Sequence, residues 1–170
     1  MRHFPRQNDF AASGASAEVH SILEAWSTPV RRPVRIALIG TFAPRRCGIA
    51  TFTADIVGCL RQFHPEISVD VHALDDAQTA MDYRDVSGVI PVHDAAGCAR
   101  AAERINESGV DVVWLQHEYG IFGGPDGAMV CDLVDRIAAP LVLTLHTVLG
   151  EPSDRQRAIM EHLLTRASRV

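Results

Sequence analysis

The chain has 170 residues, of which 47% are hydrophobic and 6% aromatic, and its formal net charge is −5. This length and apolar content allow one domain with a substantial core. The low aromatic share and the absence of a basic stripe argue against nucleic acid as a partner.

The four cysteines are scattered along the chain without the spacing of a metal site, which is typical of reduced thiols. No apolar run approaches the ~18 residues that span a bilayer, and the first residues lack the apolar segment of a signal peptide. We therefore expect a cytoplasmic protein without a transmembrane segment.

The composition changes near residue 33. Residues 1–33 are rich in Arg, Ser, Ala and Pro, and within them only residues 17–26 have the pattern of a helix. We predict that 1–33 form an N-terminal arm, partly disordered or helical. Residues 34–170 alternate apolar runs with amphipathic segments, and we predict that they form the folded domain.

The first unit of this domain is a strand and a helix. Residues 34–39 are apolar apart from Arg35 and show no alternation, which predicts a strand buried on both faces of a parallel sheet. A helix should follow Gly48, because apolar residues recur on one face: Ile49, Phe52, Ile56, Val57 and Leu60. Residues 67–74 predict a second strand, and residues 77–86 favour no element.

Three further units follow. Residues 89–92 predict a short strand, with Asp94 capping a helix that runs to about Asn106. Residues 110–115 predict the fourth strand, followed by a helix that begins near Pro125 or Asp126 and buries Val130, Leu133, Val134 and Ile137. Residues 141–145 predict the fifth strand, and the helix after Pro152 should bury Met160, Leu163, Leu164 and Ala167. Five strands alternating with helices predict an α/β fold with a doubly wound, Rossmann-like parallel sheet.

The loop after the first strand, residues 40–49, suits an anion. Backbone N–H groups at the start of the next helix can receive one, Gly48 allows a close approach, and Arg45 and Arg46 add positive charge. The alternative is a tight turn with two solvated arginines. Neither the dinucleotide fingerprint nor the P-loop pattern is present.

A second polar block, residues 114–124, follows the fourth strand. His117 and Glu118 match the first two residues of the zinc-protease motif HExxH. Ile121 occupies the position of the second histidine ligand, so we expect no metal. His117 could hydrogen-bond a hydroxyl or phosphate, or it could be a buried structural histidine. Glu118 could hold a sugar hydroxyl.

The rest of this block contains glycines and aromatic residues, and further polar residues follow the fifth strand. Three glycines within residues 120–124 would bring the backbone close to a ligand, while Tyr119 could line the pocket or pack beneath the loop. His146 and Thr147 follow the fifth strand. Because the carboxyl ends of parallel strands meet at one edge, we expect Gly48, His117 and His146 to share the rim of a ligand-binding cleft.

These blocks resemble the N-terminal domain of family 4 glycosyltransferases of the GT-B fold, in particular a bacterial branch. The resemblance rests on residues 44–53 (PRRCGIATFT), 116–124 (QHEYGIFGG) and 144–147 (TLHT), and it covers about residues 35–170. Such enzymes have two Rossmann-like domains that face a cleft. The chain would be a single N-terminal, acceptor-side half of that fold, apparently truncated.

The resemblance implies retaining transfer of a hexose, mannose or glucose, from a nucleotide sugar to a hydroxyl of a carbohydrate or lipid-linked acceptor. No cofactor or essential metal is implied. By position, His117 and His146 would be catalytic. The donor phosphates would lie near Gly48, Ile49, Arg45 and Arg46. The substrate would be bound by Glu118, Tyr119, Gly120, Gly123, Gly124 and Thr147.

Two departures from the family pattern limit what the chain is expected to do alone. The first loop has one glycine, at position 48, where many relatives have two. The paired glutamates of the donor half are absent, since none of the eight Glu residues has another eight positions later. We therefore expect an acceptor-side domain that is inactive without a C-terminal donor domain. The alternatives are a stand-alone module that binds a nucleotide or sugar phosphate, and a domain that binds a partner protein.

Overall fold

A computed structural model describes residues 32–78 and 81–170, and Pro33–Val170 form one compact unit. The predicted arm, residues 1–33, lies outside the described residues except for its last two positions. None of the helices in the described ranges is long and apolar enough to cross a membrane.

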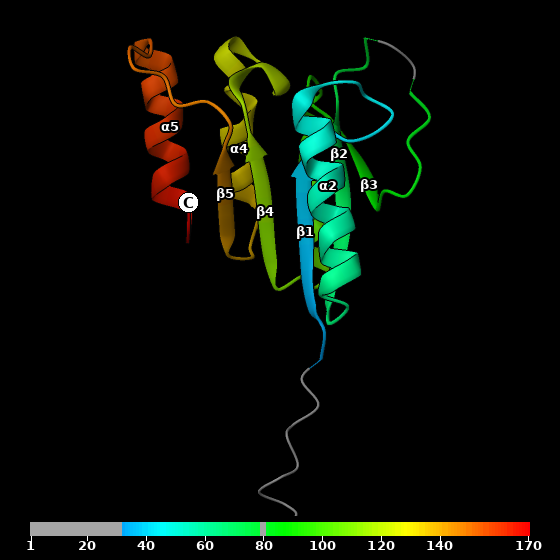
Figure 1. The fold of residues 1–170 in the computed structure, drawn as a ribbon. Coiled ribbons are helices and arrows are strands. Elements are labelled where there is room, and N and C mark those ends of the chain that lie inside the picture. The colour runs from blue at the N-terminus through cyan, green and yellow to red at the C-terminus, as the bar shows by residue number, and fades with distance from the viewer. Residues whose placement is uncertain (1–31, 79–80) are drawn as a thin grey trace, which may run out of the picture. The chain divides into compact units, whose positions relative to one another are not determined.

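The centre of the unit is a five-stranded parallel sheet in the order β3-β2-β1-β4-β5 (Figure 1). The strands are β1 (Val34–Gly40), β2 (Ile67–Asp75), β3 (Gly88–Pro91), β4 (Val112–His117) and β5 (Leu141–Leu145). In the central strand β1, Ile39 pairs with His72 on one side and Leu115 on the other. The predicted α/β fold with a doubly wound parallel sheet is thereby confirmed.

Helices cover both faces of this sheet. Helix α2 (Gly48–Phe63) lies in front of β1 and β2 in Figure 1, and α4 (Met129–Arg136) lies behind the sheet. Helices α3 (Ala95–Glu107) and α5 (Asp154–Arg166) share one large apolar cluster with α4, whereas a smaller cluster fills the space beneath α2. The core is therefore divided by the sheet into two layers.

The face of α2 that meets the sheet differs from the predicted apolar stripe by about one residue. The buried positions are Ala50, Thr53 and Val57, while Phe52 is 42% exposed. Small residues let the helix lie close to the sheet, and Thr53 can face it because its hydroxyl donates to the Ile49 carbonyl at 2.8 Å. In α5, Leu163 is buried as predicted, but the predicted core residue Leu164 is exposed and Ile159 is buried in its place.

The helix expected from Pro125 or Asp126 begins later, at Met129. The segment Pro125–Gly127 is a short 3₁₀ turn, in which Asp126 and Gly127 have φ angles of 54° and 78°. These left-handed conformations interrupt the α-helical hydrogen-bond pattern. The positive end of the α4 dipole therefore lies near Met129 and not at Pro125.

Candidate functional site

The polar blocks gather at the carboxyl edge of the sheet, where the strand order reverses. The chain passes from β1 to β2 and β3 on one side, and then to β4 and β5 on the other. The loops that leave β1 and β4 therefore diverge, and ligands of open α/β sheets bind in the crevice between them. The loop after β5 joins them, because the His146 backbone N–H donates to the His117 carbonyl at 3.0 Å.

The side chains of Gln116 and His146 form a hydrogen-bonded pair beside α2. His146 Nε2 lies 2.9 Å from Gln116 Oε1. Because an amide oxygen only accepts, Nε2 must carry the proton, and Nδ1 of the neutral ring is left as an acceptor. The ring of Phe52 meets the His146 ring edge-on at a centroid distance of 5.0 Å.

Gln116 is fully buried, yet its Nε2 has no hydrogen-bond partner among the described residues. Its side chain points toward α2, since a Cβ atom placed on Gly40 would meet Gln116 Cγ at 3.0 Å and Thr53 Oγ1 at 3.2 Å. A buried amide N–H group without a partner lowers the stability of the folded protein by about 1–3 kcal/mol. The position therefore favours a ligand that can accept its N–H groups.

The first turn of α2 forms one wall of the crevice. Cys47 is the N-cap residue, and its sulfur accepts from the Ala50 N–H at 3.4 Å and lies 3.2 Å from Thr41 Oγ1. Gly48 has open space around it, because an added Cβ would meet nothing within 4 Å. The space beside Gly48 is thus open at the helix start, where the sequence leads us to expect an anion.

The charge expected from the two arginines is not concentrated there. Arg45 forms an ion pair with Asp76 at 2.9 Å, and both side chains are mostly buried. Arg46 is exposed, and Ile49 is half-buried against the larger core cluster. Of the residues assigned to donor phosphates, Gly48 alone combines accessibility with a place at the helix start.

The pKa of Cys47 is lowered. Burial raises it, but the hydrogen bonds from Thr41 and Ala50, the positive charge of Arg45 and the Ile49 backbone together outweigh burial. A helix N-terminus favours a thiolate for the same reason that it favours other anions. The site therefore stabilises negative charge at the α2 N-terminus.

His117 lies on the opposite face of the sheet from Gln116. Its side chain is 1% exposed, with the ring 5.0 Å from Tyr119 in an edge-on arrangement and stacked on Phe122 at 5.9 Å. Burial lowers the pKa of His117 to about 4, against a smaller opposing effect of Glu118. The expectation that His117 and His146 face one cleft is therefore not met, because successive strand residues point to opposite faces.

Glu118 and Thr147 connect the loops after β4 and β5. The Thr147 hydroxyl donates to Glu118 Oε2, and the Tyr119 N–H donates to Glu118 Oε1 at 2.9 Å. Each carboxylate oxygen can accept further hydrogen bonds. The pair therefore fixes the geometry of both loops and still offers acceptors to a ligand.

The three predicted ligand-binding glycines have different roles. Gly120 has free space, since a Cβ there would meet nothing within 4 Å. Gly123 packs so closely on the residue after β3 that a Cβ would lie 2.0 Å from the Val92 carbonyl oxygen, and Gly124 has a φ of 78°. The fold itself therefore requires Gly123 and Gly124, and only Gly120 leaves room for a ligand.

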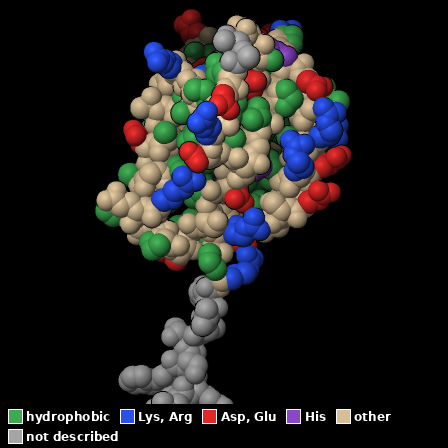
Figure 2. Space-filling model, turned by 90° about the vertical axis from the view of Figure 1, so that its right-hand side faces the viewer, with side chains coloured by type: hydrophobic (Ala, Val, Ile, Leu, Met, Phe, Trp, Pro, Cys, Tyr) green, Lys and Arg blue, Asp and Glu red, His purple; other side chains and the backbone are tan. Residues whose placement is uncertain are grey.

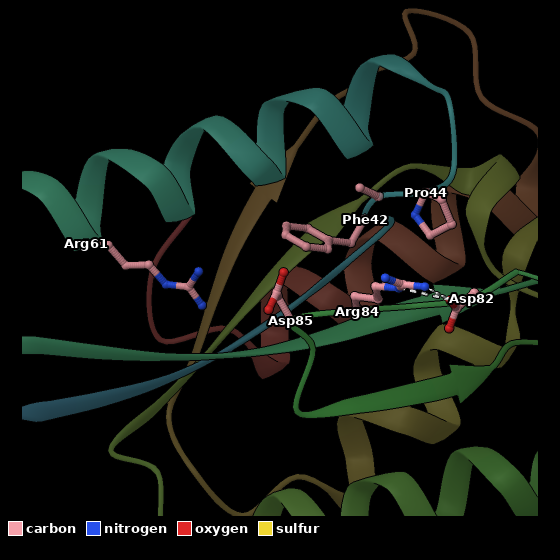
Figure 3. Close-up of a pocket in the computed structure, with 7 residues that line it drawn as sticks. Phe42, Pro44, Arg61, Asp82, Arg84 and Asp85 are labelled. Carbon is pink, nitrogen blue, oxygen red and sulfur yellow. Dashed lines mark hydrogen bonds and ion pairs between the residues drawn. The ribbon is translucent and has the colours of Figure 1, made fainter.

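Two hollows lie near this edge. The larger, of about 460 Å³, contains none of the predicted site residues; its lining is Phe42, Ala43, Pro44, Arg61, Asp82, Arg84 and Asp85. Figure 3 shows Phe42 beneath α2, with Arg84 paired to Asp82. The smaller, of about 190 Å³, includes the predicted residue Tyr119; its other lining residues are Val148, Leu149, Pro152, Arg157, Met160 and Glu161.

The charged side chains on the surface do not indicate a particular kind of ligand. On the face in Figure 2, basic and acidic side chains are intermixed. Within residues 32–78 and 81–170, no group of three His, Cys, Asp or Glu side chains could hold a metal ion.

Three residues of the crevice received no role in the sequence analysis. Gln116 and Thr41 are fully buried polar residues at strand ends, and Cys47 caps α2. The available signal was the position of each polar residue directly after an apolar strand. The sequence matches no protein-family model, and no curated protein matches it.

Proposed function

We propose that this chain is the acceptor-side domain of a retaining glycosyltransferase, which moves a hexose from a nucleotide sugar to a hydroxyl group. The main support is the Gln116–His146 pair, in which a buried amide N–H group without a described partner lies next to an imidazole acceptor. A sugar hydroxyl both donates and accepts, so it suits such a pair. The resemblance of the three sequence blocks supplies the reaction type.

The residues divide into two roles in this proposal. Gln116 and His146 hold the acceptor hydroxyl, and Glu118 and Thr147 fix the loops that carry them. The open backbone around Gly48 stabilises the negative charge that develops on the leaving diphosphate. His117 supports the loop from beneath Tyr119 and Phe122 and does not touch the sugar.

The proposal is tested by nuclear magnetic resonance titration of the 170-residue chain with methyl α-mannoside and methyl α-glucoside. We expect one of them to shift the amide signals of residues 116–120 and 146–148. The variants Gln116→Leu and His146→Ala should each weaken this binding at least tenfold, because each removes a hydrogen bond to the ligand.

His64→Ala is the matched control, since His64 is an exposed histidine next to the last residue of α2, at the other end of that helix from Cys47. Its variant should bind the sugar like the unchanged chain. The alternative of a stand-alone nucleotide module predicts the reverse pattern, in which a nucleotide sugar binds tightly and neither methyl glycoside shifts these signals. That pattern would refute the acceptor assignment.

A further inference from the structure

The smaller hollow lies between the loop after β5 and helix α5. Its walls are mainly apolar, from Val148, Leu149, Pro152 and Met160, and the Tyr119 ring closes one side. The Tyr119 hydroxyl donates to the Gln156 carbonyl at 3.3 Å, which fixes the ring against α5. The hollow is therefore built from the loops after β4 and β5 and from α5, and this hydrogen bond joins the loop after β4 to α5.

Two of its apolar side chains are turned toward solvent. Val148 is 76% exposed and Leu149 is 36% exposed, and they are consecutive in the chain. On α5, Ile159 and Leu163 are buried, whereas Leu164, which does not line the hollow, is 46% exposed. Exposed apolar residues that line a concave surface favour a ligand that removes them from water.

The size of the hollow limits what it can hold. Its volume of about 190 Å³ is below the roughly 300–1,000 Å³ of pockets that enclose a whole drug-sized ligand. It can therefore take one group of a larger molecule, and the remainder of that molecule must lie outside it.

Two residues that line the hollow are chain neighbours of the polar pair at the ends of β4 and β5. Tyr119 follows Glu118 in the chain, and Val148 follows Thr147, whose hydroxyl donates to the Glu118 carboxylate. A ligand whose apolar group fills the hollow can therefore extend its polar part toward this pair. Arg157 and Glu161 border the hollow with opposite charges, so neither a cationic nor an anionic group is favoured there.

We propose that this hollow binds an uncharged apolar group, an alkyl chain or an aromatic ring, that the acceptor carries beside its hydroxyl-bearing part. This inference rests on the proposed function, which places the acceptor hydroxyl at Gln116 and His146, and His146 directly precedes Thr147 in the chain. It narrows the acceptor class to amphipathic glycosides or alcohols. Val148 and Leu149 then determine specificity by contact with the apolar group.

The inference is tested by calorimetric titration of the 170-residue chain with methyl and hexyl α-mannosides and with the corresponding glucosides. The glycosides are kept below their micelle concentration. Burial of a methylene group strengthens binding by roughly fourfold. We expect the hexyl glycoside to bind at least tenfold more tightly than the methyl glycoside of the same sugar. Comparing the affinities of the phenyl and hexyl glycosides then shows whether the hollow prefers an aromatic ring or an alkyl chain.

The double variant Val148→Ser, Leu149→Ser should reduce the hexyl-to-methyl ratio to near one while leaving the methyl glycoside affinity unchanged. Phe63→Ser is the matched control, because Phe63 is a 65% exposed apolar residue at the far end of α2. It should retain the full ratio. Nonspecific adhesion of the alkyl chain would give the same ratio in all three proteins and would overturn the inference.

The remaining outcomes separate the inference from the proposed function. Equal affinities for methyl and hexyl glycosides in the unchanged chain would refute the hollow and leave the acceptor site standing. Hexyl binding that disappears in the double variant but survives in Gln116→Leu and His146→Ala would support the hollow and refute the acceptor site. No binding of any glycoside would refute both.

Discussion

A buried polar side chain lowers stability unless it is hydrogen-bonded, and the two neighbours Gln116 and His117 depart from this rule in different surroundings. Gln116 has one satisfied atom and one unsatisfied atom, beside the open N-terminus of α2. Neither ring nitrogen of His117 has a hydrogen-bond partner within the described ranges, and the ring lies between two aromatic rings. The first arrangement favours a polar ligand, whereas the second favours a neutral ring that acts as part of the core.

This difference explains which part of the site could be predicted from the sequence. The polar blocks after β1, β4 and β5 were expected to meet. Those at β4 and β5 are joined by a hydrogen bond from the His146 N–H to the His117 carbonyl. The assignment of His117 to the cleft followed its charge chemistry and ignored the two-residue alternation of β4, which directs Gln116 to the α2 side. Gln116 received no role because an amide has no titration or charge pattern to mark it.

The thiol of Cys47 provides a test of the α2 N-terminus that needs no ligand. In a Cys59→Ser background, alkylation by iodoacetamide across pH should reveal a thiol whose pKa lies below the ordinary value. Thr41→Val should shift that profile to higher pH, since it removes a hydrogen bond that lowers the pKa of Cys47. An unchanged profile in Thr41→Val would show that the thiolate is not stabilised by this hydroxyl.

Whole elements were predicted more accurately than single side chains, because apolar periodicity reports burial averaged over several residues. The fifth strand has the predicted bounds, and the four predicted core positions from Val130 to Ile137 are all buried. On α2, Val57 is buried as predicted, but the buried position of Thr53 was missed because Thr53 satisfies its own hydroxyl within the helix, which no apolarity pattern records. The late start of α4 depends on left-handed residues in the preceding turn, including a non-glycine, Asp126.

The loop between β4 and α4 offers a matched pair of glycine variants. Gly123→Ala should lower the free energy of unfolding by about 1–3 kcal/mol, because its Cβ would overlap the Val92 carbonyl and force the loop away from β3. Gly120→Ala should change it by less than about 0.5 kcal/mol, since its Cβ has free space. Urea denaturation measures both, and equal effects would mean that the loop is not wedged against β3.

For the whole molecule, buried neutral histidines link stability to pH. Burial lowers the pKa of His117 to about 4 and also lowers the pKa of His72, where Asp70 opposes and Arg104 adds to the shift. Unfolding returns these rings to water, where they bind protons near pH 6.5. Below that pH the unfolded chain binds more protons than the folded one, so the free energy of unfolding must fall as the pH falls.

The size of this effect can be measured between pH 7.5 and 5, above the range in which most carboxylates titrate. His117 alone should remove about 2 kcal/mol from the free energy of unfolding between pH 6.5 and 5, at about 1.4 kcal/mol per pH unit. His117→Phe should abolish this share, because a phenyl ring can replace the imidazole between Tyr119 and Phe122 without binding a proton. The control His64→Ala, at an exposed position, should keep the full pH dependence. If the unchanged chain and His117→Phe lose stability equally on acidification, His117 is not held neutral by burial, and its place in the core layer beneath the candidate site is refuted.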